Sequence, residues 1–132
     1  MPTRRDAFSE QECRIIVRMA REVVCEAHGI SHAQLHARLR GGARLAQARQ
    51  MAMYLAHVIG QLSLAEVAAT FGRDRSTVSH ACINIEDRRD SPIFNLQMEY
   101  LEKCLRERIQ DYHCRTLAAA SPVRERKSAL QH

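Results

Sequence analysis

Apolar residues recur at helical spacing from about Ser9 onward, and they predict a first helix that runs to Ala27 or His28. Ser9 followed by Glu12 has the spacing of a capping box, which gives this helix a defined start. Gly29 is placed to end it. The apolar positions on its inner face are Ile15, Ile16, Met19, Val23 and Ala27.

A short helix and a long helix are expected next. Ser31 can cap the short one, and Gly41–Gly42 then interrupts the pattern. The long helix is predicted from about Arg44 to Ile59, with Gly60 as its C-terminal stop. The apolar positions are Leu35 and Leu39 in the short helix, and Leu45, Ala48, Ala52, Leu55, Ala56 and Ile59 on one stripe of the long helix.

The segment 63–82 predicts two helices joined by a tight turn at Phe71–Gly72. Ser63 with Glu66 is a second capping box, and residues of the Asp74-Arg-Ser-Thr segment are suited to open the second helix. This spacing is typical of a helix-turn-helix, whose second helix reads the major groove of DNA. The predicted core side consists of Leu64, Val67, Ala68, Phe71, Val78, Cys82 and Ile85, and the opposite face carries Arg75, Ser76, Ser79, His80 and Ile83.

A final helix is predicted from Ser91–Pro92 to about Leu117, because Ser followed by Pro forms a good N-cap and first turn. No segment alternates with period two for long enough to form a convincing strand, so the fold class is all-α. The expected organisation is a flexible N-terminus at 1–8, one domain at 9–117 and a disordered tail at 118–132. The apolar stripe of the last helix is Phe94, Met98, Leu101, Leu105, Ile109 and Tyr112.

The charge of the chain suits a polyanionic partner. The formal net charge is +5 and the isoelectric point is near 9.3. From Ala27 to Ala65 there is no Asp or Glu, whereas this segment contains four arginines and four histidines. Such a stretch beside a helix-turn-helix is expected of a surface that contacts phosphates, with chance in an arginine-rich composition as the alternative.

The five cysteines are widely spaced, with no C-x-x-C pair, and the N-terminus does not resemble a secretory signal. No apolar run approaches membrane-spanning length. We therefore expect reduced thiols in a cytoplasmic, nucleoid-associated protein with no membrane partner. Cys82 and Cys104 are expected to fill core positions.

Parts of the sequence also resemble a metal site and a catalytic pair. Cys25, His28, His32 and His36 have spacings compatible with zinc ligands, but Gly29 breaks the helix between them, and no metal or other cofactor is expected. The Asp74–His80 pair lacks a nucleophile in a cleft, so the sequence predicts neither an enzyme nor a small-molecule substrate.

Three motifs carry a resemblance to a known family. The segments Arg49-Gln-Met-Ala-Met-Tyr-Leu-Ala, Leu62-Ser-Leu-Ala-Glu-Val and Arg73-Asp-Arg-Ser-Thr-Val-Ser-His-Ala-Cys resemble the C-terminal, origin-binding domain of the bacterial replication initiator DnaA. The likeness covers roughly residues 12–106. The chain has no G-x-x-x-x-G-K-[ST] phosphate loop, so the expected protein is the DNA-reading module alone, without ATPase activity.

The resemblance implies a set of contacts to bases. Asp74, Ser76, Thr77 and His80 would face base edges, together with Arg75, which stands where the family usually has His. Arg can donate two hydrogen bonds to guanine, whereas Ser76 lacks the methyl of the family's usual Thr, so the preferred sequence is expected to differ from the initiator's own. The alternatives are that Arg75 is a solvated charge and that His80 is a core residue.

The resemblance also implies contacts to the DNA backbone. The matching positions are Arg49, Gln50, Ser63, Leu64, Ala65 and Arg73. The family's basic loop, which sends an Arg into the minor groove, is replaced here by Arg40-Gly-Gly-Ala-Arg44, and either Arg40 or Arg44 is expected to fill that role.

Three functions of different class follow. The first is sequence-specific binding of double-stranded DNA at sites related to initiator boxes, as a transcriptional regulator or a modulator of replication initiation. The alternative is a protein-interaction module that keeps the fold without DNA binding and contacts the initiator or other replication or transcription proteins. The third is a zinc-dependent regulator that uses the cluster from Cys25 to His36.

Overall fold

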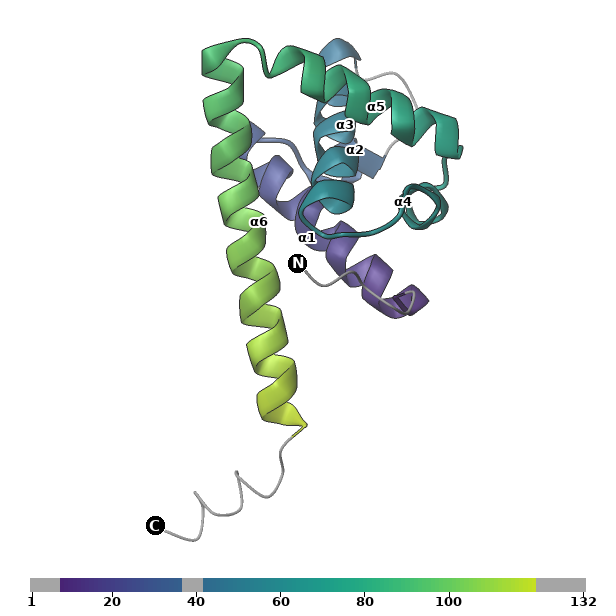
Figure 1. The fold of residues 1–132 in the computed structure, drawn as a ribbon, viewed down its shortest axis with the longest axis vertical. Coiled ribbons are helices and arrows are strands. Elements are labelled where there is room, and N and C mark those ends of the chain that lie inside the picture. Colours follow the sequence, from purple (N-terminus) through teal and green to yellow (C-terminus); the bar gives the residue numbers. More distant parts are fainter. Residues whose placement is uncertain (1–7, 37–41, 121–132) are drawn as a thin grey trace, which may run out of the picture.

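The computed structural model describes residues 8–36 and 42–120, and these two ranges form six helices and no strand (Figure 1). The all-α fold class is therefore confirmed. The helices are α1 (Glu10–His28), α2 (His32–His36), α3 (Gly42–Val58), α4 (Leu64–Phe71), α5 (Arg75–Arg88) and α6 (Pro92–Ala119).

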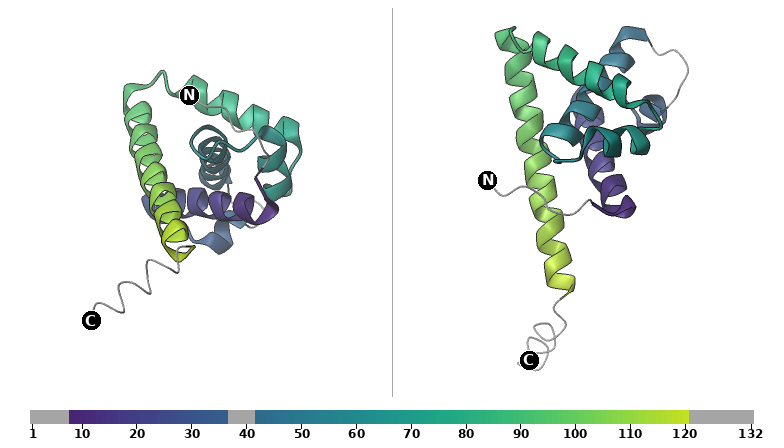
Figure 2. Two further views of the ribbon diagram at one scale, coloured as in Figure 1. Left: turned by 60° about the horizontal axis from the view of Figure 1, so that its bottom comes forward. Right: turned by 45° about the vertical axis from the view of Figure 1, so that its right-hand side comes forward.

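Helix α3 lies at the centre of the molecule. It contacts α1, α4, α5 and α6, which surround it in the left view of Figure 2. All six residues from Met51 to Ala56 are buried. The sequence predicted one apolar stripe, but this part of α3 is buried on every side because neighbouring helices cover it all round. The helix also begins at Gly42, two residues earlier than predicted.

The capping boxes define the starts of α1 and α4 as predicted. The Ser9 hydroxyl accepts a hydrogen bond from the Glu12 amide at 3.1 Å, and the Ser9 amide donates to the Glu12 carboxylate at 2.9 Å. At its other end α1 stops at Gly29, whose φ of 64° lies in the left-handed region that favours glycine. These local signals fix the bounds of α1 independently of its packing.

The buried face of α5 differs in one detail from the prediction. Val78 and Ile85 are buried as predicted, but Ala81 is the third fully buried residue, and Cys82 is only half-buried. Cys104 is half-buried too, so these two cysteines pack against the edge of the core and are not among its fully buried residues. The fully buried cysteines lie on α1 at positions 13 and 25.

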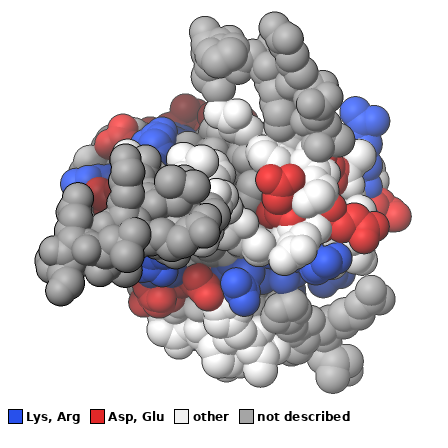
Figure 3. Space-filling view, turned by 90° about the horizontal axis from the view of Figure 1, so that it is seen from below, with Lys and Arg blue, Asp and Glu red and all other residues white. Residues whose placement is uncertain are grey.

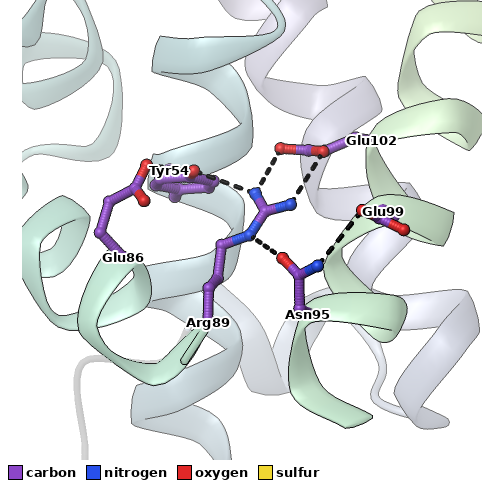
Figure 4. A network of polar contacts seen from close by, with 6 residues as sticks. All are labelled: Tyr54, Glu86, Arg89, Asn95, Glu99 and Glu102. Atoms are coloured by element: carbon purple, nitrogen blue, oxygen red, sulfur yellow. Dashed lines mark hydrogen bonds and ion pairs between the residues drawn. The ribbon is translucent and has the colours of Figure 1, made fainter. Parts of the chain in front are cut away.

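A network of polar side chains joins α3, the end of α5 and α6 (Figure 4). The Arg89 guanidinium donates to Glu102 at 2.7 Å, to the Tyr54 hydroxyl at 3.1 Å and to Asn95 at 2.7 Å. The Tyr54 hydroxyl in turn donates to Glu86 at 2.6 Å. Glu102 is only 8% exposed, and a buried carboxylate requires hydrogen-bond donors. Arg89 supplies them in this network.

Helix α6 is long, and its fully buried residues lie in its first half, while Ile109 and Tyr112 further along are half-buried against the core. Its buried residues lie between Phe94 and Leu105, and it ends at Ala119, two residues beyond the predicted end. Arg108 forms ion pairs with Glu22 and Glu26, which tie α6 to α1.

No helix in the described part of the chain is long and apolar enough to cross a membrane. Seen from below, acidic and basic side chains lie close together on the face of Figure 3 that is not grey.

Candidate nucleic-acid interface

The outer face of α5 presents a row of polar side chains. Arg75, Ser76, Thr77 and His80 are all exposed, and they occupy the first two turns of the helix. In Figure 1 this end of α5 lies beside α4, at the opposite end from the junction with α6. The buried positions of α5 turn the other way, so these side chains are available to a ligand.

Gln50 of α3 joins this row. It lines, together with Ser76, Thr77 and His80, one open hollow of about 310 Å³. The lining therefore combines amide, hydroxyl and imidazole groups, which both donate and accept hydrogen bonds. The sequence predicted a contact of Gln50 with the DNA backbone, and the fold brings this residue beside the predicted base-contacting residues of α5.

Gly72 forms the turn that orients α5. Its φ is 67°, and its amide hydrogen-bonds to carbonyl groups at the end of α4. The Arg73 amide donates to the Ala68 carbonyl at 2.9 Å, and its side chain is half-buried. Asp74 occupies the N-cap of α5 and is exposed, but its side chain makes no capping hydrogen bond. Its carboxylate is therefore available for another partner.

The start of α4 offers backbone amide groups. The Ser63 amide donates to Glu66 at 2.8 Å, and the Ser63 hydroxyl accepts from the Glu66 amide at 3.0 Å. Between Ser63 and Glu66 in the sequence, the amides of Leu64 and Ala65 have no hydrogen-bond partner among the described residues. Amide groups at such a position point away from the helix and can bind a phosphate.

Two predicted backbone-contacting arginines make contacts within the protein. Arg44 donates to the His28 carbonyl, and the Arg49 Nε donates to the Leu35 carbonyl at 3.1 Å. Both thereby link the start of α3 to the ends of α1 and α2. Burial, and then the nearby Arg44 cation, lower the pKa of His28 below its usual 6.5. Arg40, the other candidate for the minor groove, lies outside the described residues.

The four residues with zinc-ligand spacing lie in different surroundings. Cys25 is buried, His28 is half-buried and His32 is exposed, while the His36 side chain lies outside the described part of the chain. Burial raises the pKa of the Cys25 thiol, which disfavours the thiolate that a metal requires. Among the described side chains, no three His, Cys, Asp or Glu residues are grouped as metal ligands.

One further residue lies on the outer face of α5. Ile83 is 56% exposed and follows His80 by three positions, so it is on the same side of the helix. The sequence predicted its position opposite the core but no role for it. Ile83 can be recognised in the sequence because it is an apolar residue on an otherwise polar helix face. At this position its side chain can contact an apolar group of a ligand, such as the thymine methyl.

The arrangement of α4, the Gly72 turn and the exposed face of α5 defines a helix-turn-helix domain. Within that class, the model of the bacterial dnaA protein helix-turn-helix matches residues 17–85, slightly more than half of the chain. The chain belongs to this family.

Relatives of known name are similar over 104 residues, or 77% of this chain. The chromosomal replication initiator protein DnaA of Herminiimonas arsenicoxydans is 38% identical, and that of Burkholderia multivorans is 35% identical. The matched region is 22% of the first relative and 20% of the second, so the chain spans about a fifth of their length.

Two solved structures share the fold. A crystal structure of a DNA replication initiation factor superposes with a TM-score of 0.68 at 28% identity, covering 76% of this chain and 31% of that one. A replication initiator DnaA bound to AMPPCP and single-stranded DNA gives a TM-score of 0.66, also at 28% identity, with 76% and 30% covered. The predicted likeness to the initiator's C-terminal domain is therefore confirmed.

Proposed function

We propose that the protein binds double-stranded DNA in a sequence-specific manner, at sites related to replication-initiator boxes. It acts through occupancy of such sites, as a transcriptional regulator or a modulator of replication initiation, and without ATPase activity. The observation that carries the proposal is the hollow in which Gln50, Ser76, Thr77 and His80 converge on the exposed face of α5. A helix face of this kind has the size and polarity to enter the major groove.

In this proposal the first turns of α5 read bases. Arg75 donates two hydrogen bonds to the O6 and N7 atoms of a guanine, and Ser76, Thr77 and His80 contact neighbouring base edges together with Asp74. Gln50 reaches the same groove from α3. Because Arg75 and Ser76 differ from the residues usual in the family, the preferred site differs from the initiator's own box.

The duplex backbone is held from several elements. The Leu64 and Ala65 amides bind one phosphate at the start of α4, with Ser63 beside them. Arg73 at the turn and Arg49 on α3 add positive charge, and Arg44 or Arg40 enters the minor groove. Several phosphate contacts imply that affinity falls on the order of a hundredfold or more between low and moderate salt.

Selection of bound duplexes from a random library tests the proposal directly, because it reports both binding and the preferred motif. Arg75→Ala is expected to weaken binding to the selected site by about 1–3 kcal/mol and to relax the preference at one base pair. Binding is measured by titration of the selected duplex and of single-base variants.

Arg115→Ala is the matched control, since this exposed arginine lies near the end of α6 and pairs with Asp111. It removes the same charge and should leave the preference unchanged. If Arg75→Ala behaves like this control, the assignment of α5 as the reading helix is wrong.

A second function is favoured by one observation, the exposed apolar residues of α6. Ile93, Leu96 and Tyr100 are 72%, 64% and 62% exposed and lie on one side of the helix. A module that binds a replication or transcription protein through this surface, with no DNA binding, predicts no retardation of any duplex in a gel-shift assay. The proposed function predicts retardation that weakens with salt.

A further inference from the structure

A basic hollow lies on α1, and its lining shares no residue with the hollow on α5. Its volume is about 600 Å³. Three arginines dominate it, and no acidic side chain is part of its lining. The lining residues are Gln11, Arg14, Ile15, Arg18 and Arg21 of α1, His32 of α2 and Thr70 of α4.

The three arginines lie on one face of α1, because they are four and three positions apart. Arg14 has a weak ion pair with Glu10 at 3.8 Å, in which both side chains are mostly exposed. Neither Arg18 nor Arg21 has an ion-pair partner among the described residues. The positive charge of this face is therefore largely uncompensated.

The guanidinium of Arg21 is partly buried against an aromatic ring and has no carboxylate partner among the described residues. Its guanidinium lies over the Phe71 ring, 4.3 Å from the ring centroid, and its buried Nε has no hydrogen-bond partner. A half-buried guanidinium ordinarily has a carboxylate beside it, since an unpaired donor away from water is unfavourable. Here the aromatic ring fixes the cation at the hollow without neutralising it.

The hollow adjoins the helix-turn-helix. Thr70 and Phe71 are the last two residues of α4, and Gly72 then leads into α5. The basic face of α1 is thus continuous with the turn that sets the position of the reading helix.

We propose that the hollow formed by Arg14, Arg18 and Arg21 binds backbone phosphates of the DNA that flanks the recognised site. The inference rests on the proposed function and extends its footprint from the helix-turn-helix to α1. Guanidinium groups suit phosphate oxygens, to which they donate two parallel hydrogen bonds. Such contacts add affinity without adding base preference.

Duplex DNA is favoured over an anionic membrane as the ligand. Interfacial helices that bind a lipid surface combine their cations with exposed apolar side chains that enter the bilayer. The large exposed apolar residues of the described chain lie on α3, α5 and α6, and none lies on α1. Ile15, the apolar residue of the hollow, is half-buried.

The test compares the double variant Arg14→Gln/Arg18→Gln with the unaltered protein on two duplexes. One duplex ends at the edges of the selected site, and the other extends it by about one helical turn, ~10 base pairs, on each side. On the longer duplex the variant should bind on the order of tenfold more weakly, and the slope of log affinity against log salt should become shallower by about 1–2. On the shorter duplex the two proteins should bind alike.

Arg106→Gln is the matched control, because this exposed arginine of α6 lines a different hollow. It should leave both duplexes unaffected, and thermal melting should show that all three proteins are folded to the same extent. If the unaltered protein binds both duplexes and the double variant matches it, the inference is wrong and the proposed function stands.

Vesicles of anionic phospholipid provide the second arm. Loss of vesicle binding in the double variant, with DNA binding unchanged, would assign the hollow to a membrane and overturn the inference. If the unaltered protein binds no duplex at all, the proposed function and this inference are both wrong.

Discussion

The two ends of α5 are built in opposite ways. At its C-terminal end Arg89 is surrounded by hydrogen-bond partners from α3 and α6, in a setting where the Arg89 and Glu102 side chains are 16% and 10% exposed. At its N-terminal end Asp74 makes no capping hydrogen bond, and the polar side chains that follow are exposed. The polar groups at the C-terminal end of α5 have hydrogen-bond partners within the protein. The carboxylate of Asp74 at the N-terminal end makes no such capping bond.

This difference separates stability from binding along one element. Groups at the C-terminal end should contribute to folding, since their partners are internal and shielded from water. Groups at the N-terminal end should contribute little to folding and much to ligand binding. The following variants test that separation, beginning with the largest expected effect.

Glu102→Ala removes the carboxylate that pairs with Arg89 and leaves a buried guanidinium without its anion. The expected loss is about 3–5 kcal/mol in the free energy of unfolding, measured by urea denaturation. Glu107→Ala, at an exposed position of the same helix, is the control and should change stability by less than about 0.5 kcal/mol. Equal stability of the two variants would show that the network does not hold α5.

Tyr54→Phe keeps the buried ring and removes only the hydroxyl that joins Glu86 to Arg89. We expect a loss of about 1 kcal/mol, since Arg89 keeps its ion pair with Glu102. Burial raises the pKa of Tyr54 to about 12. The folded state therefore favours the neutral phenol, and the stability from this group is full below pH 10 and is lost as the pH rises toward 12. Urea denaturation of the Tyr54→Phe variant from about pH 9 to 12 should not show this loss of stability.

Ser63→Ala and Asp74→Ala compare two N-caps. Ser63 makes its capping hydrogen bond, so its removal should destabilise the protein by about 1 kcal/mol. Asp74 makes none, and its replacement should change the unfolding free energy by only a few tenths of a kcal/mol, ~0.3. The same Asp74→Ala variant should nevertheless weaken binding to the selected duplex. A stability loss as large as that of Ser63→Ala would place Asp74 among the structural residues.

The smallest effect is expected at the end of α1. Burial, with a contribution from Arg44, lowers the pKa of His28, so the folded state favours the neutral imidazole. The stability that this provides is full above the unfolded pKa near 6.5 and is lost as the pH falls through the lower folded pKa. Between neutral and mildly acidic pH, the melting temperature of His28→Asn should therefore fall less than that of the unaltered protein.

Local signals made the helix-turn-helix predictable. A capping box, a glycine at positive φ and a change of polarity each depend on residues close together in the sequence, and they placed the bounds of α1, α4 and α5 well. The exposed row from Arg75 to His80 followed from the same periodicity. These features need no knowledge of long-range packing.

The polar network was not predictable by the same means. Tyr54, Arg89 and Glu102 are 35 and 13 positions apart, and their charges resemble those of ordinary solvated residues. The burial of α3 on every side between Met51 and Ala56, and the place of Gln50 beside Ser76, likewise depend on which helices surround α3. Such properties arise from tertiary packing, which periodicity alone does not encode.

Gln50 and Tyr54 are one helical turn apart on α3, so this one helix contributes both to the proposed reading face and to the network at the far end of α5. The proposed reading face is therefore already formed in the unbound protein. Association should then need no folding step, and the heat-capacity change on binding should reflect the contact area alone, without the additional term that accompanies ordering of a segment.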